Sequence, residues 1–245
     1  MGDNSGAVAY VKSQERTVQG LGLVLKSYQL AGNVSEQQLL DLILKLNLDK
    51  TVNGIIVQMP LPGHIDCKKI YDFISPDKDI EGMHPANMGK LLCGRSKIIT
   101  CTASAVMELL NSTGIDLSGK EAVIVGHSGI VGKPLAMLLL EKLATVTVCH
   151  IGTSKAGKLE EHVRKAEVLI VAVGKAGLIK GDWIKPGAII IDVGINRVGD
   201  KIVGDVEFEE AGKRASFITP VPGGVGPLTV IMLMRNLVQA AKLQQ

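Results

Sequence analysis

Short apolar runs alternate with amphipathic stretches along the second half of the chain. The runs are the right length for strands, and the stretches between them repeat apolar residues with helical spacing. The pattern predicts strands at 121–125, 145–149, 168–173, 188–192 and 216–218. It predicts helices from about 132 to 143, at 159–165 and at 208–214. Regular alternation of this kind predicts an α/β fold with a largely parallel sheet.

The first half is less regular. Its pattern predicts helices at 7–21, 35–48, 67–74 and 103–112, and strands at 23–30 and 54–58. Ser35 followed by Gln38 has the spacing of a capping box, which fixes the start of the second helix. A last helix is predicted at 228–242. The 114–119 loop separates the two halves, so we expect two α/β domains.

Composition narrows the classes of function. The chain has 245 residues, of which 46% are hydrophobic, enough for a sizeable core. A net charge of +3 without a basic run, and an aromatic content of 3%, argue against nucleic acid as a partner. The sequence contains no signal peptide and no apolar span of membrane length. We therefore expect no membrane association.

The cysteines at 67, 93, 101 and 149 lie far apart and form no pair with metal-ligand spacing. We read them as reduced thiols in an intracellular protein without a metal site. The sequence does not distinguish the cytoplasm from a mitochondrion. Cys101 has no histidine near it in sequence, which favours a buried, inert thiol over a nucleophile.

A glycine-bearing turn follows the strand at 121–125. Backbone N–H groups at the start of the next helix can bind a pyrophosphate there. The spacing differs from G-x-G-x-x-G because Ser128 replaces the middle glycine, and many strand-to-helix turns carry glycine. Three strands end at or near a glycine, at Gly126, Gly174 and Gly194. This repetition strengthens the prediction of a dinucleotide-binding fold, because ligands bind outside the carboxyl ends of strands.

The stretch 219–227 (TPVPGGVGP) contains three prolines and three glycines between apolar segments. Proline fixes φ, and glycine permits a positive φ and close approach. We expect a rigid loop, poorly suited to helix or strand. The residues alone leave open whether it is a connector or a ligand-contacting wall.

Several longer motifs extend this interpretation. They are 54–62 (GIIVQMPLP), 75–82 (SPDKDIEG), 126–134 (GHSGIVGKP), 191–196 (IDVGIN), 203–206 (VGDV) and 219–227. Together they resemble the methylenetetrahydrofolate dehydrogenase/methenyltetrahydrofolate cyclohydrolase family, in order and over nearly the whole chain. The resemblance implies two α/β domains with a cleft, folate in the cleft, and a nicotinamide dinucleotide on a Rossmann-like second domain. It also implies a homodimer.

The family reaction has two steps. A hydride passes from 5,10-methylenetetrahydrofolate to NAD or NADP, and water then opens the methenyl cation to 10-formyltetrahydrofolate. The resemblance assigns residues 1–113, closed by a helix at 228–245, to folate, and residues 114–227 to the dinucleotide. Family members have a helix and a strand before the segment that matches Gly2, so we expect both to be missing from this chain.

The resemblance implies the site residues. The catalytic candidates are Tyr10, Gln14, Gln58 and Glu81. The tetrahydrofolate-binding candidates are Tyr10, Gln58, Pro60, Leu61, Glu81, Pro222, Gly223 and Gly224. The cofactor-binding candidates are Thr102, Gly126, His127, Ser128, Ile130, Val131, Gly132, His150, Gly174, Gly194 and Ile195. Without the resemblance, Tyr10 would be interpreted as a half-buried packing residue and Gln14 as an exposed helix residue. Lys78 would be interpreted as part of an exposed charged turn.

The chain departs from the family pattern at informative positions. Gln14 stands where the family has a lysine that handles protons, and an amide does not titrate. Glu81 replaces aspartate at the pterin contact, and Thr100 replaces a proline. We therefore expect a methylenetetrahydrofolate dehydrogenase with an impaired cyclohydrolase step. A fully bifunctional enzyme and a non-catalytic binding or dimerisation module remain alternatives.

The cofactor side also departs from the pattern. His127 stands where NADP-using members commonly have arginine, and Ile151 where they have serine. Arginine binds a 2′-phosphate with a bidentate pair of hydrogen bonds, and neither substitute offers this. The cofactor is therefore NAD or NADP, with NAD favoured.

Overall fold

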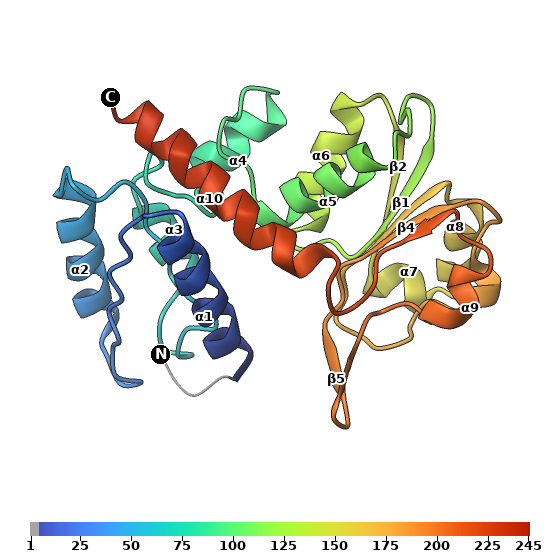
Figure 1. The fold of residues 1–245 in the computed structure, drawn as a ribbon, viewed down its shortest axis with the longest axis horizontal. Coiled ribbons are helices and arrows are strands. Elements are labelled where there is room, and N and C mark those ends of the chain that lie inside the picture. Colours follow the sequence, from blue (N-terminus) through green and yellow to red (C-terminus); the bar gives the residue numbers. More distant parts are fainter. Residues whose placement is uncertain (1–4) are drawn as a thin grey trace. The chain divides into compact units, whose positions relative to one another are not determined.

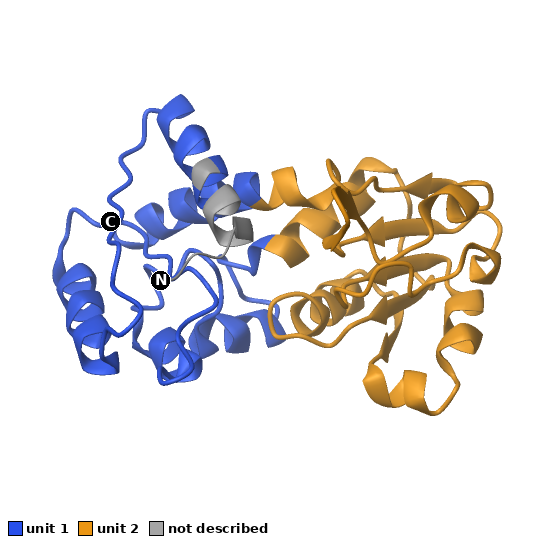
Figure 2. Ribbon diagram, turned by 90° about the horizontal axis from the view of Figure 1, so that it is seen from below, with its two compact units in different colours: residues 1–101, 230–245 blue, residues 102–229 orange. Residues whose placement is uncertain are grey.

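The structure, a computed structural model, describes the backbone of residues 5–245 and the side chains of residue 11 and residues 13–245. The chain divides into two compact units (Figure 2). Unit 1 contains the residues up to Cys101 and those from Val230 onward, and unit 2 contains Thr102–Thr229. Each unit is described separately below.

Unit 2 is built on a five-stranded parallel sheet with the order β2-β1-β3-β4-β7. The strands are β1 (Glu121–Val125), β2 (Thr145–Cys149), β3 (Val168–Val171), β4 (Ile189–Asp192) and β7 (Phe217–Ile218). The chain leaves β1 toward β2 and then crosses to β3 on the other side of β1. Ligands of such sheets bind at this reversal, beyond the carboxyl ends of the strands.

Helices cover both faces of this sheet (Figure 1). They are α5 (Cys101–Ser112), α6 (Gly132–Glu141), α7 (Ile151–Lys155), α8 (Leu159–Lys165), the 3₁₀ turn Gly181–Trp183 and α9 (Phe208–Gly212). Alternate residues of β1 point to opposite faces, and Val123 and Val125 pack with Leu159 and Val163 of α8. Because β1, β3 and β4 are buried along almost their whole length, they appear in the sequence as continuous apolar runs. The predicted α/β class and Rossmann-like unit are confirmed.

A small antiparallel hairpin follows β4. It consists of β5 (Asn196–Val198) and β6 (Lys201–Val203). The sequence pattern did not predict it, because each strand has three residues and mostly exposed side chains. The hairpin leads directly into Gly204 and Asp205, and the Asp205 side chain is buried.

Unit 1 is largely helical in the part of the chain that the structure describes. Its helices are α1 (Ser5–Gly20), α2 (Glu36–Leu48), α3 (Cys67–Phe73), α4 (Pro85–Leu92) and α10 (Val225–Leu243), which enters the unit at Val230. The predicted capping box is confirmed, because the Ser35 hydroxyl accepts from Gln38 N–H and the Gln38 side chain accepts from Ser35 N–H. The core gathers Leu39, Leu40 and Ile43 of α2 around Ile55 and Ile70.

Two predicted strands in unit 1 are wrong. Residues 23–30 have no strand, and residues 54–58 contribute a single bridge between Ile55 and Asp79. A strand requires a neighbour that takes its backbone hydrogen bonds, and no second strand lies beside either segment among the described residues. Ile55 and Val57 are nevertheless buried. At these two positions the apolar pattern correctly indicated burial, but it wrongly indicated pairing with a neighbouring strand.

The Pro-Gly loop is shorter than predicted. Helix α10 begins at Val225, so Val225, Gly226 and Pro227 form its first turn. Proline is tolerated there because the first N–H groups of a helix have no partner within the helix. The non-helical part of the loop is therefore 219–224.

Candidate functional site

The turn after β1 requires glycine at two positions. Gly126 has a φ of 124°, and a Cβ on it would collide with the carbonyl oxygen of Ala172. A Cβ on Gly132, the first residue of α6, would collide with the carbonyl oxygen of Gly126. The start of α6 therefore lies directly against the carboxyl end of β1. This close approach fits a pyrophosphate-binding turn of a dinucleotide fold.

Ser128 holds this turn in place. Its hydroxyl accepts a hydrogen bond from the N–H of Val131 at 3.1 Å, and its carbonyl oxygen accepts from Lys133 N–H at 3.0 Å. Val131 is buried, whereas Ile130 is 47% exposed beside it. The serine at the middle position thus closes the turn, and Ile130 is available to a ligand.

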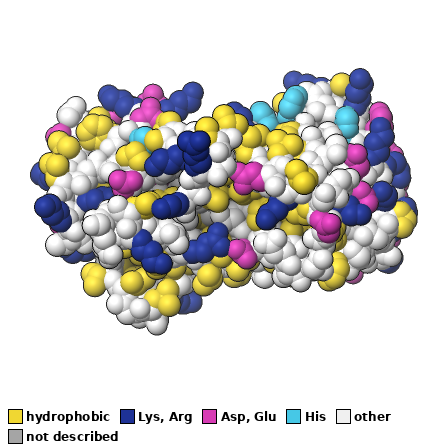
Figure 3. Space-filling view, turned by 90° about the horizontal axis from the view of Figure 1, so that it is seen from above, with side chains coloured by type: hydrophobic (Ala, Val, Ile, Leu, Met, Phe, Trp, Pro, Cys, Tyr) yellow, Lys and Arg dark blue, Asp and Glu magenta, His cyan; other side chains and the backbone are white. Residues whose placement is uncertain are grey.

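Two histidines lie beside each other where β1 and β2 end. The ring centroids of His127 and His150 are 5.2 Å apart, with planes tilted by 54°. His150 is the N-cap of α7, and its Nδ1 accepts a hydrogen bond from Gly152 N–H at 3.0 Å. Ile151 next to it is 67% exposed. Figure 3 shows histidine side chains exposed at the surface. This edge presents the two imidazoles and the exposed Ile151 to a ligand bound beyond β1 and β2.

A buried carboxylate organises the loop after β3. Asp205 is 0% exposed, and its carboxylate accepts from the N–H groups of Val173, Gly174 and Lys175 at 2.7, 3.0 and 2.7 Å. The side-chain amide of Asn196 donates a fourth hydrogen bond at 2.8 Å. Asp205 therefore joins the loop that carries Gly174 to the β5–β6 hairpin.

A second buried carboxylate, Asp192, lies at the end of β4. It accepts hydrogen bonds from the N–H groups of Gly194 at 2.9 Å, Asp205 at 3.1 Å and Val206 at 2.9 Å. Burial raises the pKa of Asp192, although the backbone N–H groups of Asp205, Val206 and Gly194 act against this rise. Both motifs that contain these aspartates are visible in the sequence, but sequence reasoning assigned neither residue a role.

Thr219 ties the Pro-Gly loop to the same centre. The backbone N–H of Asp192 donates to the Thr219 hydroxyl at 2.8 Å. Further along the loop, Pro222 follows a cis peptide, Gly223 has a φ of 105°, and Gly224 leaves no space for a Cβ beside Pro220. This geometry fits the shaped loop expected from the sequence, whose rigidity stays a prediction, and the loop exposes Pro222 and Gly223.

In unit 1 the structure brings Gln14 and Gln58 together. Gln58 Nε2 donates to Gln14 Oε1 at 2.9 Å. Gln14 is 4% exposed, so the interpretation of position 14 as an exposed helix residue is wrong. Gln14 Nε2 is buried and has no hydrogen-bond partner among the described residues. Tyr10 lies on α1, but its side chain is outside the described residues.

The segment after Gln58 bears two further candidates. Pro60 follows a cis peptide and is exposed, and Leu61 is buried in the core of unit 1. The segment thus fixes Gln58 between a packed leucine and the buried Val57. The remaining substrate candidate of unit 1 with a described side chain is Glu81.

Glu81 has an unusual environment for a carboxylate. Its Oε2 is buried without a hydrogen-bond partner among the described residues. Burial, and to a smaller extent the neighbouring Asp79, raises the pKa of Glu81 to about 7, against a hydrogen bond from the Val57 backbone. Near neutral pH the group therefore exists both as an acid and as a carboxylate. Asp79 is different, because its carboxylate accepts from Met83 N–H, His84 N–H and Asn87 Nδ2.

Lys78 is a structural cation. It is 6% exposed, and its ammonium donates to the carbonyl oxygens of Leu46, Asn47 and Asp49 at 2.9, 2.8 and 2.7 Å. These are the last carbonyls of α2, which a cation stabilises. Burial lowers the pKa of Lys78. The interpretation of Lys78 as an exposed turn residue is wrong.

Helix α5 starts with Cys101, the thiol expected to be inert. Burial, and to a smaller extent Glu81, raises the pKa of Cys101 to about 12, and Asn236 donates to its sulfur at 3.5 Å. Thr102 next to it is half-buried. The Thr100 hydroxyl is buried with no partner among the described residues, at a position where the chain departs from the family. The expected burial of this thiol is confirmed, and its inertness stays a prediction.

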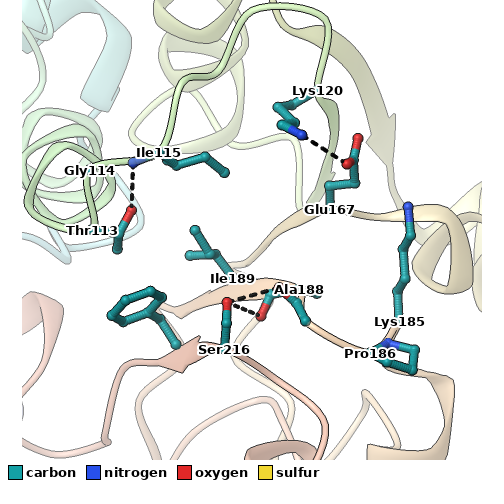
Figure 4. A pocket seen from close by; sticks show the side chains of 12 residues that line it. Thr113, Gly114, Ile115, Lys120, Glu167, Lys185, Pro186, Ala188, Ile189 and Ser216 are labelled. Atoms are coloured by element: carbon teal, nitrogen blue, oxygen red, sulfur yellow. Dashed lines mark hydrogen bonds and ion pairs between the residues drawn. The ribbon is translucent and has the colours of Figure 1, made fainter.

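A cavity of about 290 Å³ lies at the opposite, amino edge of the unit 2 sheet (Figure 4). Its walls include Ile115, Ile189 and Phe217, and the ion pair of Lys120 and Glu167 at 3.2 Å. None of the predicted site residues lines it. The cavity is therefore separate from the carboxyl edge.

Two other kinds of feature are absent from the part of the chain that the structure describes. Within the described residues, no cluster of three or more His, Cys, Asp or Glu side chains has the geometry to hold a metal ion. No helix in the same part of the chain is both long and apolar enough to cross a membrane.

Comparison with known proteins adds to this geometry. Residues 1–81 match the tetrahydrofolate dehydrogenase/cyclohydrolase catalytic domain, and residues 100–245 match the NAD(P)-binding domain of the same enzymes. The chain is 51% identical over 245 residues to the bifunctional protein FolD of Acetivibrio thermocellus, covering all of this chain and 85% of that protein.

Two solved structures are similar throughout. The bifunctional enzyme FolD, methylenetetrahydrofolate dehydrogenase/cyclohydrolase from Campylobacter jejuni, has a TM-score of 0.95 and 47% identity, over 100% of this chain and 86% of that one. The Trypanosoma brucei methylenetetrahydrofolate dehydrogenase-cyclohydrolase, complexed with NADP and an inhibitor, has a TM-score of 0.94 and 40% identity, over 99% and 84% of the two chains.

Proposed function

The chain belongs to the tetrahydrofolate dehydrogenase/cyclohydrolase family, and we propose how its own residues perform and limit the family's two reactions. It is an enzyme of folate one-carbon metabolism that oxidises 5,10-methylenetetrahydrofolate to the methenyl compound with NAD(P). When bound, the cofactor supplies the hydride acceptor. The protein's part is to bind, orient and exclude water.

The folate side is proposed for unit 1 and for the Pro-Gly loop. Gln58 and Glu81 offer polar contacts to a pterin, and Gln58 fixes the orientation of the Gln14 amide. Pro222, Gly223 and Gly224 let a ligand approach the backbone closely. The contact expected from Tyr10 stays a prediction. The division of tasks between residues 1–113 with 228–245 and residues 114–227 also stays a prediction.

Impairment of the cyclohydrolase step is the most specific part of the proposal. The observation that supports it is the buried Gln14, whose Oε1 is already held by Gln58 Nε2 at 2.9 Å. Opening the methenyl cation with water requires a group that gives up and accepts a proton. An amide does neither, whereas hydride transfer depends on orientation and is preserved.

One observation favours the bifunctional alternative. The raised pKa of Glu81, about 7, would allow this carboxyl group to exchange protons at neutral pH in place of the missing lysine. The two possibilities differ in their rates. An impaired enzyme accumulates methenyltetrahydrofolate, whereas a bifunctional one consumes it as it forms.

On the cofactor side, we propose a preference for NAD over NADP. The edge beyond β1 and β2 presents the His127–His150 pair and the exposed Ile151, and these groups lack the planar cationic fork that binds a 2′-phosphate. The residues proposed to contact the cofactor are Thr102, Gly126, His127, Ser128, Ile130, Val131, Gly132, His150, Gly174, Gly194 and Ile195.

A homodimer is the proposed assembly. The observation on this chain that supports it is the β5–β6 hairpin, which presents Val198 at 55% and Ile202 at 46% exposure. Light scattering with size exclusion would report a mass of two chains, and Ile202→Asp would shift it to one. Leu92→Asp, at another exposed apolar position, would leave it unchanged. The intracellular location stays a prediction.

A single assay tests the enzymatic proposal. The purified protein is mixed with methylenetetrahydrofolate and NAD or NADP, and both the methenyl product and the reduced cofactor are followed by absorbance. We expect reduced cofactor and methenyltetrahydrofolate to accumulate together. Reduced cofactor without methenyl accumulation would support the bifunctional enzyme, and absence of both would support a non-catalytic module.

A further inference from the structure

The two buried carboxylates of unit 2 form one connected centre. Asp205 N–H donates to Asp192 Oδ1 at 3.1 Å, and both side chains contact Gly194. Gly194 N–H donates to Asp192, and its α-carbon lies so close to the Asp205 carboxylate that a Cβ would collide with it. Gly204 packs equally close to the Asp192 carboxylate. These glycines allow two carboxylates to be buried within one small volume.

Neither carboxylate has a cationic partner. Among the described residues, no lysine, arginine or histidine forms an ion pair with Asp192 or Asp205, which are 3% and 0% exposed. Their partners are neutral: six backbone N–H groups and the amide of Asn196. Buried charges are ordinarily paired, because removal from water is costly. These N–H donors favour the ionised carboxylates, whereas burial and the neighbouring carboxylate oppose the charge of Asp192. Any negative charge that the centre keeps lies at the carboxyl ends of β3 and β4.

Three of the proposed cofactor contacts adjoin this centre. Gly174 and Gly194, two of the proposed cofactor contacts, donate their N–H groups to the two carboxylates. Ile195, a third proposed contact, follows Gly194 and is 68% exposed. The nicotinamide ring carries a positive charge in the oxidised cofactor and none in the reduced form.

We infer that Asp192 and Asp205 are positioning residues that also select the oxidation state of the cofactor, favouring the oxidised, cationic nicotinamide over the reduced one. The inference rests on the proposed dehydrogenase function. It predicts two separable effects. The hydrogen bonds fix the loops at 173–175, 193–196 and 219–224, and the charge discriminates between the two cofactor forms.

The test measures dissociation constants without folate, using isothermal titration calorimetry with NAD⁺ and NADH. We expect the wild-type protein to bind NAD⁺ at least as tightly as NADH. Asp205→Asn keeps the size of the side chain and removes one charge, but its NH₂ group also replaces one of the two acceptor oxygens, a structural loss that should weaken both cofactor forms alike. The variant should weaken NAD⁺ binding about three- to tenfold more than NADH binding, the size of one partly screened charge interaction. Equal weakening of both forms, or no change in either, would overturn the inference.

Two control variants separate charge from structure. Asp200→Asn removes a carboxylate from the exposed tip of the same hairpin and should leave both constants unchanged. Thr219→Val removes the hydroxyl that accepts Asp192 N–H without altering charge, so it should weaken both cofactor forms equally. If Thr219→Val changed the ratio of the NAD⁺ and NADH dissociation constants, the selectivity could not be assigned to charge.

The remaining outcomes are also informative. If Asp205→Asn does not fold by circular dichroism, Asp192→Asn tests the same charge. If neither variant folds, the ratio of the NAD⁺ and NADH dissociation constants of the wild-type protein tests the inference. Tighter binding of NADH than of NAD⁺ would then overturn it. A wild-type protein that binds neither NAD⁺ nor NADH, with NADP⁺ and NADPH tested in parallel, would contradict the proposed function itself.

Discussion

Gln58 donates its amide to Gln14 across 44 positions of sequence, with 2.9 Å between Nε2 and Oε1. The direction of this bond determines what Gln14 presents. Because its oxygen is occupied, the free group is its NH₂, which can donate but cannot release a proton at neutral pH. Position 14 is thus a fixed neutral donor where the family resemblance implies a titrating cation.

The first prediction restores that cation. Gln14→Lys should raise the rate of methenyltetrahydrofolate hydrolysis at least about tenfold, because proton transfer by a positioned side chain contributes this much or more. The dehydrogenase rate should change less. Decay of methenyl absorbance measures the first rate, and cofactor reduction the second. Gln19→Lys, an exposed position on the same helix, serves as the control. Unchanged hydrolysis in Gln14→Lys would show that position 14 does not limit this step.

The second prediction concerns Glu81 and pH. The pKa in the folded protein, about 7, lies above the ordinary value of 4.5, so folding favours the protonated form. The stability gained from this form is present below the ordinary pKa and is lost as pH rises through about 7. Glu81→Gln has no such loss. Its free energy of unfolding relative to wild type should increase by about 1–3 kcal/mol between pH 5 and pH 8.

Urea unfolding at several pH values measures this difference. Glu209→Gln removes an exposed carboxylate on α9 and provides the matched control. A difference between Glu81→Gln and wild type that stays constant from pH 5 to pH 8 would show that Glu81 is ionised throughout this range.

The third prediction concerns the preference for NAD. His127→Arg would add the planar donor fork that a 2′-phosphate requires, beside His150. The affinity for NADP should rise about tenfold, the effect of roughly 1.4 kcal/mol from a charge-assisted pair, with little change for NAD. Calorimetry with both cofactors measures it. His162→Arg adds the same charge on α8 and should change neither affinity, whereas an unaltered NADP affinity in His127→Arg would count against this position.

The fourth prediction concerns Asn236 on α10. Its amide donates to the carbonyl oxygens of Ile80 at 2.9 Å and Ile99 at 2.7 Å, and it is 2% exposed. Asn236→Leu would leave both carbonyls buried without this donor and should lower the free energy of unfolding by about 2–4 kcal/mol. Gln244→Ala removes two exposed hydrogen bonds to Asn53 and Asp77 and should cost less than about 1 kcal/mol. Urea unfolding measures both variants. Equal losses of unfolding free energy in Asn236→Leu and Gln244→Ala would contradict this prediction.

The sequence predicted unit 2 better than unit 1 for a physical reason. Strands β1 and β2 were predicted to the residue. Strand β1 is buried and appears in sequence as an apolar run bounded by turns, whereas β2 is a half-exposed edge strand that is recognised by its β-branched residues. Residues 23–30 also contain apolar residues, but among the described residues they have no neighbouring strand and most of their side chains are exposed. The pattern records apolar character, whereas pairing and burial depend on segments distant in sequence.

The missed elements are short or begin with unusual caps. Helix α4 starts at Pro85 behind His84, whose ring nitrogen accepts the N–H of Ala86, and histidine is not among the common caps. The polar network of Asp192, Asp205 and Thr219 was also missed. Both aspartates lie in motifs that the resemblance uses, but only coordinates reveal that their partners are backbone N–H groups from three loops.

The unpaired apolar stretch near the start of unit 1 has a practical consequence. Val24 is 86% exposed, Tyr28 51% and Leu25 41%. An extended segment with unpaired backbone and apolar side chains is a template for association with other chains. The colloidal behaviour of the protein at high concentration is therefore expected to depend on this stretch, and sulfate, which strengthens apolar association, should precipitate it readily. Val24→Lys is the substitution most suited to keeping concentrated samples clear.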